Sequence, residues 1–297
     1  MMRGARTWAV AVRDPDGEIE VVTHDVPTWS ERWSKFPVVR GVAALGESLG
    51  LGFKALAWSA ERQLPEEERI SSKAMGWTMA IALIFFTGVF ILLPSLVNRG
   101  VADAFGVSGF EYHLVEGAIR LAIFIGYLVL IAQLKDIKRV FEYHGAEHKA
   151  IAAYENGVEL TPVEAQKFST EHVRCGTNFL LTVMVVTIFV YAFVGRPALP
   201  ILILSRIVLI PVVAGISYEV IRFAARHMDK RWVRFLMRPG LALQRLTTRE
   251  PSLDQLEVAI ASLRAAMTAE QLAEVAARTS APALGKPAQP RPAFGAA

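Results

Sequence analysis

The sequence is poor in charged residues and in cysteine. Asp, Glu, Lys and Arg make up 20% of its 297 residues and hydrophobic residues 53%, which excludes an average soluble chain. Its single cysteine, Cys175, cannot close an internal disulfide, so the sequence gives no sign of an oxidising compartment. Residues 1–70 also lack a continuous apolar stretch behind a basic start, so we expect no cleaved signal peptide. Together these features predict a membrane protein inserted through internal spans.

The chain carries a modest excess of positive charge. Its formal net charge is +4, and the basic residues cluster beside the apolar stretches instead of covering one face. Such a distribution favours a cytoplasmic membrane surface over nucleic acid. We therefore expect the lipid bilayer as a partner and no nucleic acid.

Apolar stretches of about 20 residues, the length that crosses a bilayer, occur four times. They are Trp77–Val97, Leu114–Leu134, Thr177–Val194 and roughly Ala198–Val220. Lys and Arg crowd the middle loop, residues 135–176, and follow the last span, whereas the other linkers carry few of them. By the positive-inside rule, both termini and the middle loop are cytoplasmic in a multi-pass protein of the cell (inner) membrane.

Residues 1–35, before the first span, predict a cytoplasmic β-hairpin. Thr7–Val12 and Glu18–Thr23 are rich in β-formers and flank a turn sequence, Asp14-Pro-Asp-Gly17. A lone hairpin is marginal in water, so we expect it to pair with another part of the protein. Within residues 36–73, Arg40–Ala60 reads as an interfacial or packed helix, with a fifth span as the alternative.

Residues 223–279, after the last span, predict short cytoplasmic helices. Ser252 with Gln255, and Thr268 with Gln271, each match a capping box that opens an Ala-rich helical pattern. Residues 280–297 are mainly Ala, Pro and Gly and predict a disordered tail. The expected fold class is an all-α polytopic membrane protein: residues 74–222 form a domain of four transmembrane helices, with the hairpin and the C-terminal helices attached.

A histidine motif follows the second predicted span. His144, Glu147 and His148 form H-x-x-E-H, the order of inverted zincins, in which two histidines bind zinc and the glutamate acts as base. Positions four apart share a face of a helix, so both imidazoles can point at one ion. Gly145 counts against a rigid helix here, since glycine costs a helix about 1 kcal/mol.

Further metal-ligand residue types lie where the spans meet the cytoplasm. His172 and Cys175 directly precede the third predicted span, and Glu219 lies at the cytoplasmic end of the fourth. We therefore predict a site for a divalent metal, with zinc as the first candidate, and Glu147 as the catalytic base. Its predicted ligands are His144, His148, His172, Cys175 and Glu219. The alternative is that the histidines are structural interfacial residues and that Cys175 is a small buried hydrophobe.

Three charged residues lie inside the predicted spans. Glu116 and Arg120 are four apart in the second span, and Arg206 lies in the fourth without a local partner. Charges at such depth cost about 2.5 to 3.5 kcal/mol each on insertion scales, so they should face the bundle interior and pair. The alternatives are a structural Glu116–Arg120 pair and a polar cavity that leads to the site.

Four segments of the chain resemble a known family. They read EYHGAEHKAIAAYE, KFSTEHVRCGTNFLL, RIVLIPVVAGISYE and PGLALQRLTTREPSLDQLEVAI, and the resemblance extends from Met1 to about Leu263. The family is the YqhQ-like group of bacterial membrane proteins, loosely described as predicted metal-dependent enzymes. The resemblance supports the loop histidines, Cys175 and Glu219 as marked positions and implies no substrate or partner. Members of that family usually continue upstream of Met1, so we expect that a strand completing the hairpin precedes this sequence.

Two functional hypotheses follow, and a third is weaker. The first is a metal-dependent hydrolase in which Glu147 takes a proton from a metal-activated water during attack on a membrane-associated substrate. The second is a non-enzymatic membrane scaffold or assembly factor whose polar loop docks a protein partner at the cytoplasmic face. A transporter is the weaker third hypothesis, because four spans without an inverted repeat offer little for alternating access.

Overall fold

The computed structural model describes residues 1–63, 72–172 and 175–280, and within them the protein is mostly helical. The N-terminal segment forms a three-stranded antiparallel sheet in the order β1-β2-β3, with β1 at Met2–Arg3, β2 at Thr7–Arg13 and β3 at Ile19–Asp25. The predicted hairpin is therefore confirmed. Its turn closes where the Gly17 N–H donates to the Asp14 carbonyl at 3.1 Å, and Gly17 takes a φ of +92° that other residues rarely adopt. Within the given sequence, Met2–Arg3 forms a third strand that pairs with β2, Met2 opposite Ala9 and Arg3 opposite Trp8.

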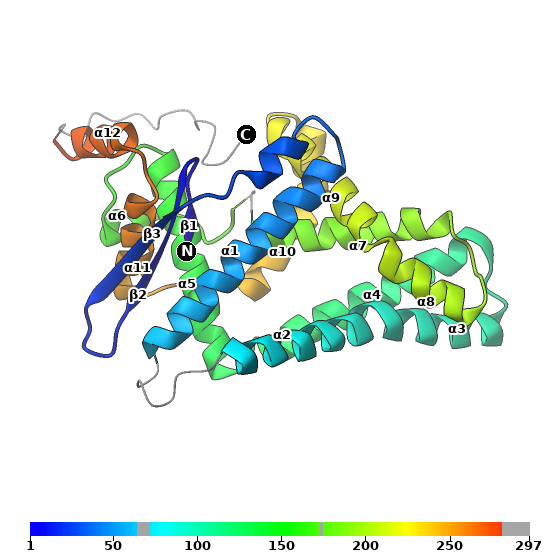
Figure 1. Cartoon of the computed structure of the whole chain (residues 1–297). Helices are drawn as coiled ribbons and strands as arrows, with labels where there is room; N and C mark the ends of the chain where they lie inside the picture. Colours follow the sequence, from blue (N-terminus) through cyan, green and yellow to red (C-terminus); the bar gives the residue numbers. More distant parts are fainter. Residues whose placement is uncertain (64–71, 173–174, 281–297) are drawn as a thin grey trace.

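Helices make up the rest of the described chain (Figure 1). They are η1 (Trp29–Trp33, a 3₁₀ turn), α1 (Val39–Gln63), α2 (Ser72–Phe86), η3 (Thr87–Leu92, a π segment), α3 (Leu93–Phe105), α4 (Gly109–Ile131), α5 (Lys135–Glu155), α6 (Pro162–Gln166), α7 (Gly176–Ala192), α8 (Leu199–Val208), α9 (Ile210–Arg226), α10 (Arg231–Thr247), α11 (Leu253–Ala265) and α12 (Ala269–Ser280). Both predicted capping boxes are present, at Ser252 with Gln255 and at Thr268 with Gln271. Of the predicted tail, residues 280–297, Ser280 ends α12 and the rest lies outside the described residues.

The sheet lies between two helices, and successive residues of β2 face them alternately. Trp8, Val10 and Val12 of β2 pack on one side against Leu51 and Ala55 of α1. The opposite side of the sheet faces α11, where the Ser262 hydroxyl donates to the Ala9 carbonyl at 3.0 Å. The hairpin therefore packs against other parts of the chain, as predicted, with α1 on one face and α11 on the other.

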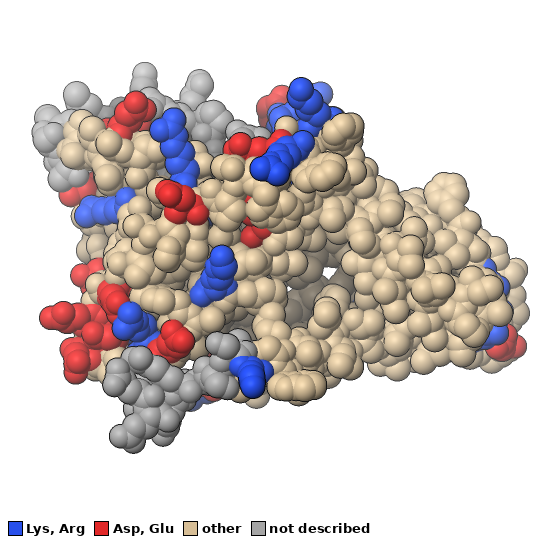
Figure 2. All heavy atoms as spheres, in the orientation of Figure 1, with Lys and Arg blue, Asp and Glu red and all other residues tan. Residues whose placement is uncertain are grey.

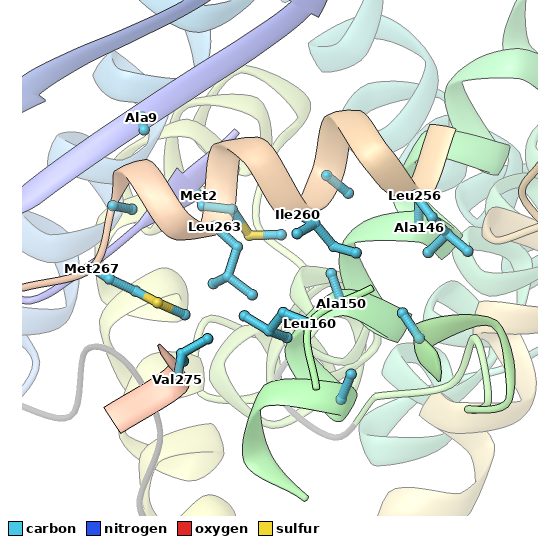
Figure 3. Close-up of a cluster of buried hydrophobic side chains, with 14 residues drawn as sticks. Met2, Ala9, Ala146, Ala150, Leu160, Leu256, Ile260, Leu263, Met267 and Val275 are labelled. Atoms are coloured by element: carbon cyan, nitrogen blue, oxygen red, sulfur yellow. The ribbon is translucent and has the colours of Figure 1, made fainter. Parts of the chain in front are cut away.

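A compact cluster of apolar side chains joins the sheet, α5 and α11 (Figure 3). On α5, the residues that enter it are alanines, which are fully buried and let α11 approach closely: Ala146, Ala150 and Ala153. Leu256, Ile260 and Leu263 of α11 fill the space opposite them. This core fixes the orientation of α5, whose other face carries the histidine motif.

Two continuous helical stretches are long and apolar enough to cross a membrane: Gly76–Phe105, which combines α2, η3 and α3, and Gly109–Ile131, which is α4. The pair α8 and α9 passes the same test together but bends by 43°, and would count as a third span. The apolar helix α7, Gly176–Ala192, has 17 residues and is shorter. Two or three apolar helices of this kind indicate a multi-pass membrane protein.

The distribution of charge over the surface agrees with a membrane location. Figure 2 shows that Lys, Arg, Asp and Glu gather over the half of the molecule that contains the sheet. The half formed by α2, α3 and α8 shows almost no charge until a small group at its far end. Large apolar side chains are open to the surroundings along α2, among them Ile81, Leu83 and Ile84. An apolar surface of this extent is typical of contact with lipid.

The charges inside the apolar half form one buried network. Glu116, which is 1% exposed, accepts from Arg120 of its own helix and from Arg206 of α8, each at 2.8 Å. Ser95 of α3 donates to the same carboxylate at 2.7 Å, and the Arg206 guanidinium lies 3.9 Å from the ring centre of Tyr191. The predicted pair is confirmed, and the partner of Arg206 is the same glutamate, 90 positions away. The network ties α3, α4, α7 and α8 together.

Candidate metal centre

His144 and His148 share one face of α5, opposite the buried alanines. Their ring centres lie 4.4 Å apart, as the one-turn spacing predicts. His148 is buried and His144 is half-buried. The two imidazoles therefore lie side by side on the face of α5 that is turned away from its core.

Each imidazole is oriented by a backbone carbonyl. The Nδ1 atom of His144 lies 2.8 Å from the carbonyl oxygen of Thr247, and the Nδ1 atom of His148 makes a short hydrogen bond to the carbonyl oxygen of Thr170. A carbonyl oxygen only accepts, so each Nδ1 must carry the proton. The lone pair of each Nε2 atom is then free to bind a metal, which is the usual arrangement of a ligating histidine and its supporting acceptor.

Cys175 reaches the same point from another helix. It is the N-cap residue of α7, and its Sγ atom lies 3.3 Å from the Nε2 atom of His144. The Thr177 hydroxyl is also 3.3 Å from Sγ. Burial raises the pKa of the Cys175 thiol, but hydrogen bonds with His144 and His148 outweigh burial and lower this pKa to about 5. Burial alone would lower the pKa of His144; its interactions with Cys175 raise it. The lowered pKa of Cys175 and the raised pKa of His144 describe a thiolate that accepts a hydrogen bond from the Nε2–H of His144, and a bound metal ion would displace that proton.

The donor atoms of His144, His148 and Cys175 all lie within 4.8 Å of one another. Two neutral imidazoles and a thiolate suit zinc, which takes nitrogen at about 2.1 Å and sulfur at about 2.3 Å. Among the described residues, this is the group of His, Cys, Asp and Glu side chains that can hold a metal. Three protein ligands leave one position of a tetrahedral zinc open, which distinguishes catalytic from closed structural sites.

Gly145 has a tertiary reason for its place in the motif. A Cβ atom added there would overlap the carbonyl oxygen of Arg249. The backbone of Arg249 crosses α5 at this point, and its N–H donates to the Phe141 carbonyl at 3.0 Å. The segment that supplies the Thr247 acceptor is therefore pressed against the helix that carries His144. Glycine lowers the helix propensity at this position, but its lack of a Cβ atom allows the Arg249 backbone to approach α5.

His172 lies beside the three donors and is held by other partners. Gln244 of α10 clamps its backbone through two hydrogen bonds of 2.8 Å, one to its N–H and one to its carbonyl. The His172 ring centre is 5.7 Å from that of His148, and its Nε2 atom lies 3.3 Å from a carboxylate oxygen of Glu155. Sequence analysis missed Glu155, although it lies seven residues after His148 and hence on the same face of α5.

Glu219 and Glu147 are not part of the group of three donors, and each is paired with a cation. Both carboxylate oxygens of Glu219 accept from the guanidinium of Arg40, on α1, with the Nε–Oε1 distance at 2.7 Å. α1 packs along α9, and this contact places the Arg40 guanidinium where it would compete with a metal ion for the Glu219 carboxylate. Glu147 lies on α5 between the two histidines in sequence, and its carboxylate accepts from the Met1 ammonium at 2.6 Å. Three of the five predicted ligands thus converge, whereas His172 lies beside them and Glu219 is paired with Arg40.

The chain is similar to known proteins over most of its length. Residues 36–269 match the family described as protein of unknown function (DUF1385). Over 292 residues the chain is 34% identical to uncharacterized protein YqhQ of Bacillus subtilis (strain 168), covering 92% of this chain and 91% of that protein. No solved structure matches the chain.

Proposed function

Because the chain belongs to the DUF1385 family, whose description carries no activity, we propose a function from the site itself: a metal-dependent hydrolase of the inner membrane that acts on a membrane-associated substrate. The observation that supports this most is the convergence of one metal-binding atom each from His144, His148 and Cys175, with both Nδ1 atoms held by backbone carbonyls. Bound there, a zinc ion would supply a Lewis acid and lower the pKa of a water in its open position to about 7.

The protein's own residues have three tasks in this proposal. His144, His148 and Cys175 hold the ion, and the carbonyls of Thr247 and Thr170 keep the two rings in the right tautomer. Glu147 is the proposed acceptor of the proton lost by water, because of its place in the motif. His172, held near His148 by Gln244 and Glu155, is positioned to contact whatever enters the site.

We further propose four spans with both termini in the cytoplasm, so that the site faces the cytoplasm. Support comes from the two long apolar helices, from the bent pair α8 and α9, and from the apolar helix α7, which has 17 residues. A cysteine introduced as Glu159→Cys, in a Cys175→Ser background, should react with an impermeant label only from the cytoplasmic side. Labelling from the outer side would overturn both the topology and the cytoplasmic site.

Metal content tests the ligands. The purified wild-type protein should contain about one zinc ion per chain, and His144→Ala/His148→Ala should contain almost none. Elemental analysis of protein in detergent measures this directly. His227→Ala, at the end of α9 and outside the group, is the matched control and should keep its zinc. Wild-type protein that carries no metal after growth and purification with added zinc would remove the proposal.

Glu147→Gln separates the hydrolase from the rival scaffold. The amide cannot accept a proton, so the variant should keep its zinc and fail to rescue a deletion strain. In a scaffold, the metal would only tie α5 to α7, and Glu147→Gln should rescue while His148→Ala loses both stability and function. Glu155→Gln, measured in parallel, reports whether the His172 pair is also required. Full rescue by Glu147→Gln would favour the scaffold with a docked protein partner.

A further inference from the structure

Helix α10 has an exposed face that is apolar and basic at once. Trp232, Phe235 and Leu236 are 52%, 65% and 64% exposed, although they are among the largest apolar side chains of the helix. At about 100° per residue, the three cover about a third of its circumference. The neighbouring sector carries exposed arginines and no acidic residue: Arg231, Arg234 and Arg238. Exposing these apolar side chains to water would cost free energy. An apolar face beside a row of arginines is typical of a helix that lies in a membrane surface.

The opposite face of α10 is buried and contacts residues of the candidate metal centre. Val233, Gly240 and Leu243 pack inward, and α10 lies against α7. Further along that face, Gln244 clamps the backbone of His172, and the carbonyl of Thr247 orients His144. One helix therefore contacts the site on one side and the surroundings on the other.

We infer that α10 lies in the surface of the cytoplasmic leaflet, with Trp232, Phe235 and Leu236 among the acyl chains and its arginines bound to anionic phospholipid headgroups. This inference rests on the proposed membrane location and names the environment from which the site receives its substrate. The occupant is lipid and not a protein because the helix continues the membrane region. Four residues separate α10 from α9, the end of the bent apolar pair, and α10 packs against the apolar helix α7.

The charge of the helix selects the class of lipid. α10 contains four arginines and no Asp or Glu, and the segment before it contains Arg226, Asp229 and Lys230. Basic residues next to a membrane are attracted to the negative potential of phosphatidylserine- or phosphatidylglycerol-type lipids. Arg245, the fourth arginine, is paired with Glu171, so three are left to contact headgroups. The metal centre consequently lies at headgroup depth, within reach of an amphiphilic substrate in the leaflet.

Fluorescence quenching by brominated lipids tests the inference on the full chain in vesicles. Phosphatidylcholine vesicles would contain a minor fraction of brominated phosphatidylglycerol or of brominated phosphatidylcholine. The chain has six tryptophans, so the quenching of Trp232 alone is obtained by subtracting the quenching of Trp232→Phe from that of wild type. We expect Trp232 to be quenched by both lipids, with at least about a fivefold binding preference for the anionic one, the factor that one basic contact supplies.

Two double variants with equal loss of charge complete the experiment. Arg234→Gln/Arg238→Gln should abolish the preference for phosphatidylglycerol, and the control Arg6→Gln/Arg62→Gln, near the sheet, should keep it. A Trp232 that neither lipid quenches would overturn the inference and indicate a protein partner on this face; equal quenching by both lipids would overturn the anionic specificity. Zinc content, measured on the same samples, keeps failure here distinct from failure of the proposed metal centre.

Discussion

Glu116→Gln should lower the free energy of unfolding by about 3–5 kcal/mol, the usual cost of removing one partner from a buried ion pair. The carboxylate is the shared partner of Arg120 and Arg206, and Arg206 has no exposed surface. An amide of nearly the same shape leaves two guanidinium groups uncompensated among apolar helices. Unfolding by heat or denaturant in detergent, followed by circular dichroism, measures the loss.

Glu111→Gln is the matched control for this change. Glu111 lies in the first turn of the same helix and is exposed, so its replacement should alter stability by less than about 0.5 kcal/mol. If both variants unfold like wild type, the buried network contributes nothing to stability, and the two arginines must find compensation elsewhere.

Gly145→Ala should destabilise the protein by about 3 kcal/mol and strongly lower the zinc occupancy of the proposed site. The new methyl group overlaps the carbonyl oxygen of Arg249, a backbone atom that cannot move aside as a side chain can. Relief requires α5 and the segment around Arg249 to separate, and that movement carries the Thr247 acceptor away from His144. Thermal unfolding and elemental analysis of one preparation would report both effects.

Gly50→Ala provides the comparison on α1. Gly50 is exposed, and a Cβ atom added there meets nothing within 4 Å. There the substitution should stabilise the helix by roughly 0.5–1 kcal/mol, because alanine has the higher helix propensity. A Gly145→Ala protein as stable as wild type, with its zinc, would show that the contact with Arg249 is not tight.

Local patterns in the sequence predicted the parts of the fold that depend on neighbouring residues. The turn at Asp14-Pro-Asp-Gly17 predicted the hairpin, and hydroxyl and amide residues three apart predicted the starts of α11 and α12. The four-residue spacing of His144 and His148 likewise placed both rings on one face of a helix. Each of these depends on interactions within a few positions of the chain, which composition and spacing record directly.

Contacts that depend on which helices pack together could not be predicted in this way. Glu219 has the side chain of a ligand, yet its partner is Arg40, 179 positions away, because α1 packs on α9. Arg206 had no predicted partner because Glu116 lies 90 positions from it. Gly145 was weighed by its helix propensity alone, whereas the passing backbone of Arg249 decides its identity. Residue type and spacing do not encode which helices meet.

The hydrogen bond from His144 to the Thr247 carbonyl joins residues that are 103 positions apart, and this distance orders events in time. A ribosome releases His144, His148 and Cys175 well before it reaches Thr247 and Arg249. During that interval one imidazole lacks the acceptor that fixes its tautomer, and α11 is not yet made to cover the other face of α5. Completion of the candidate metal centre therefore waits until α10 and α11 have left the ribosome and closed over residues that were synthesised much earlier.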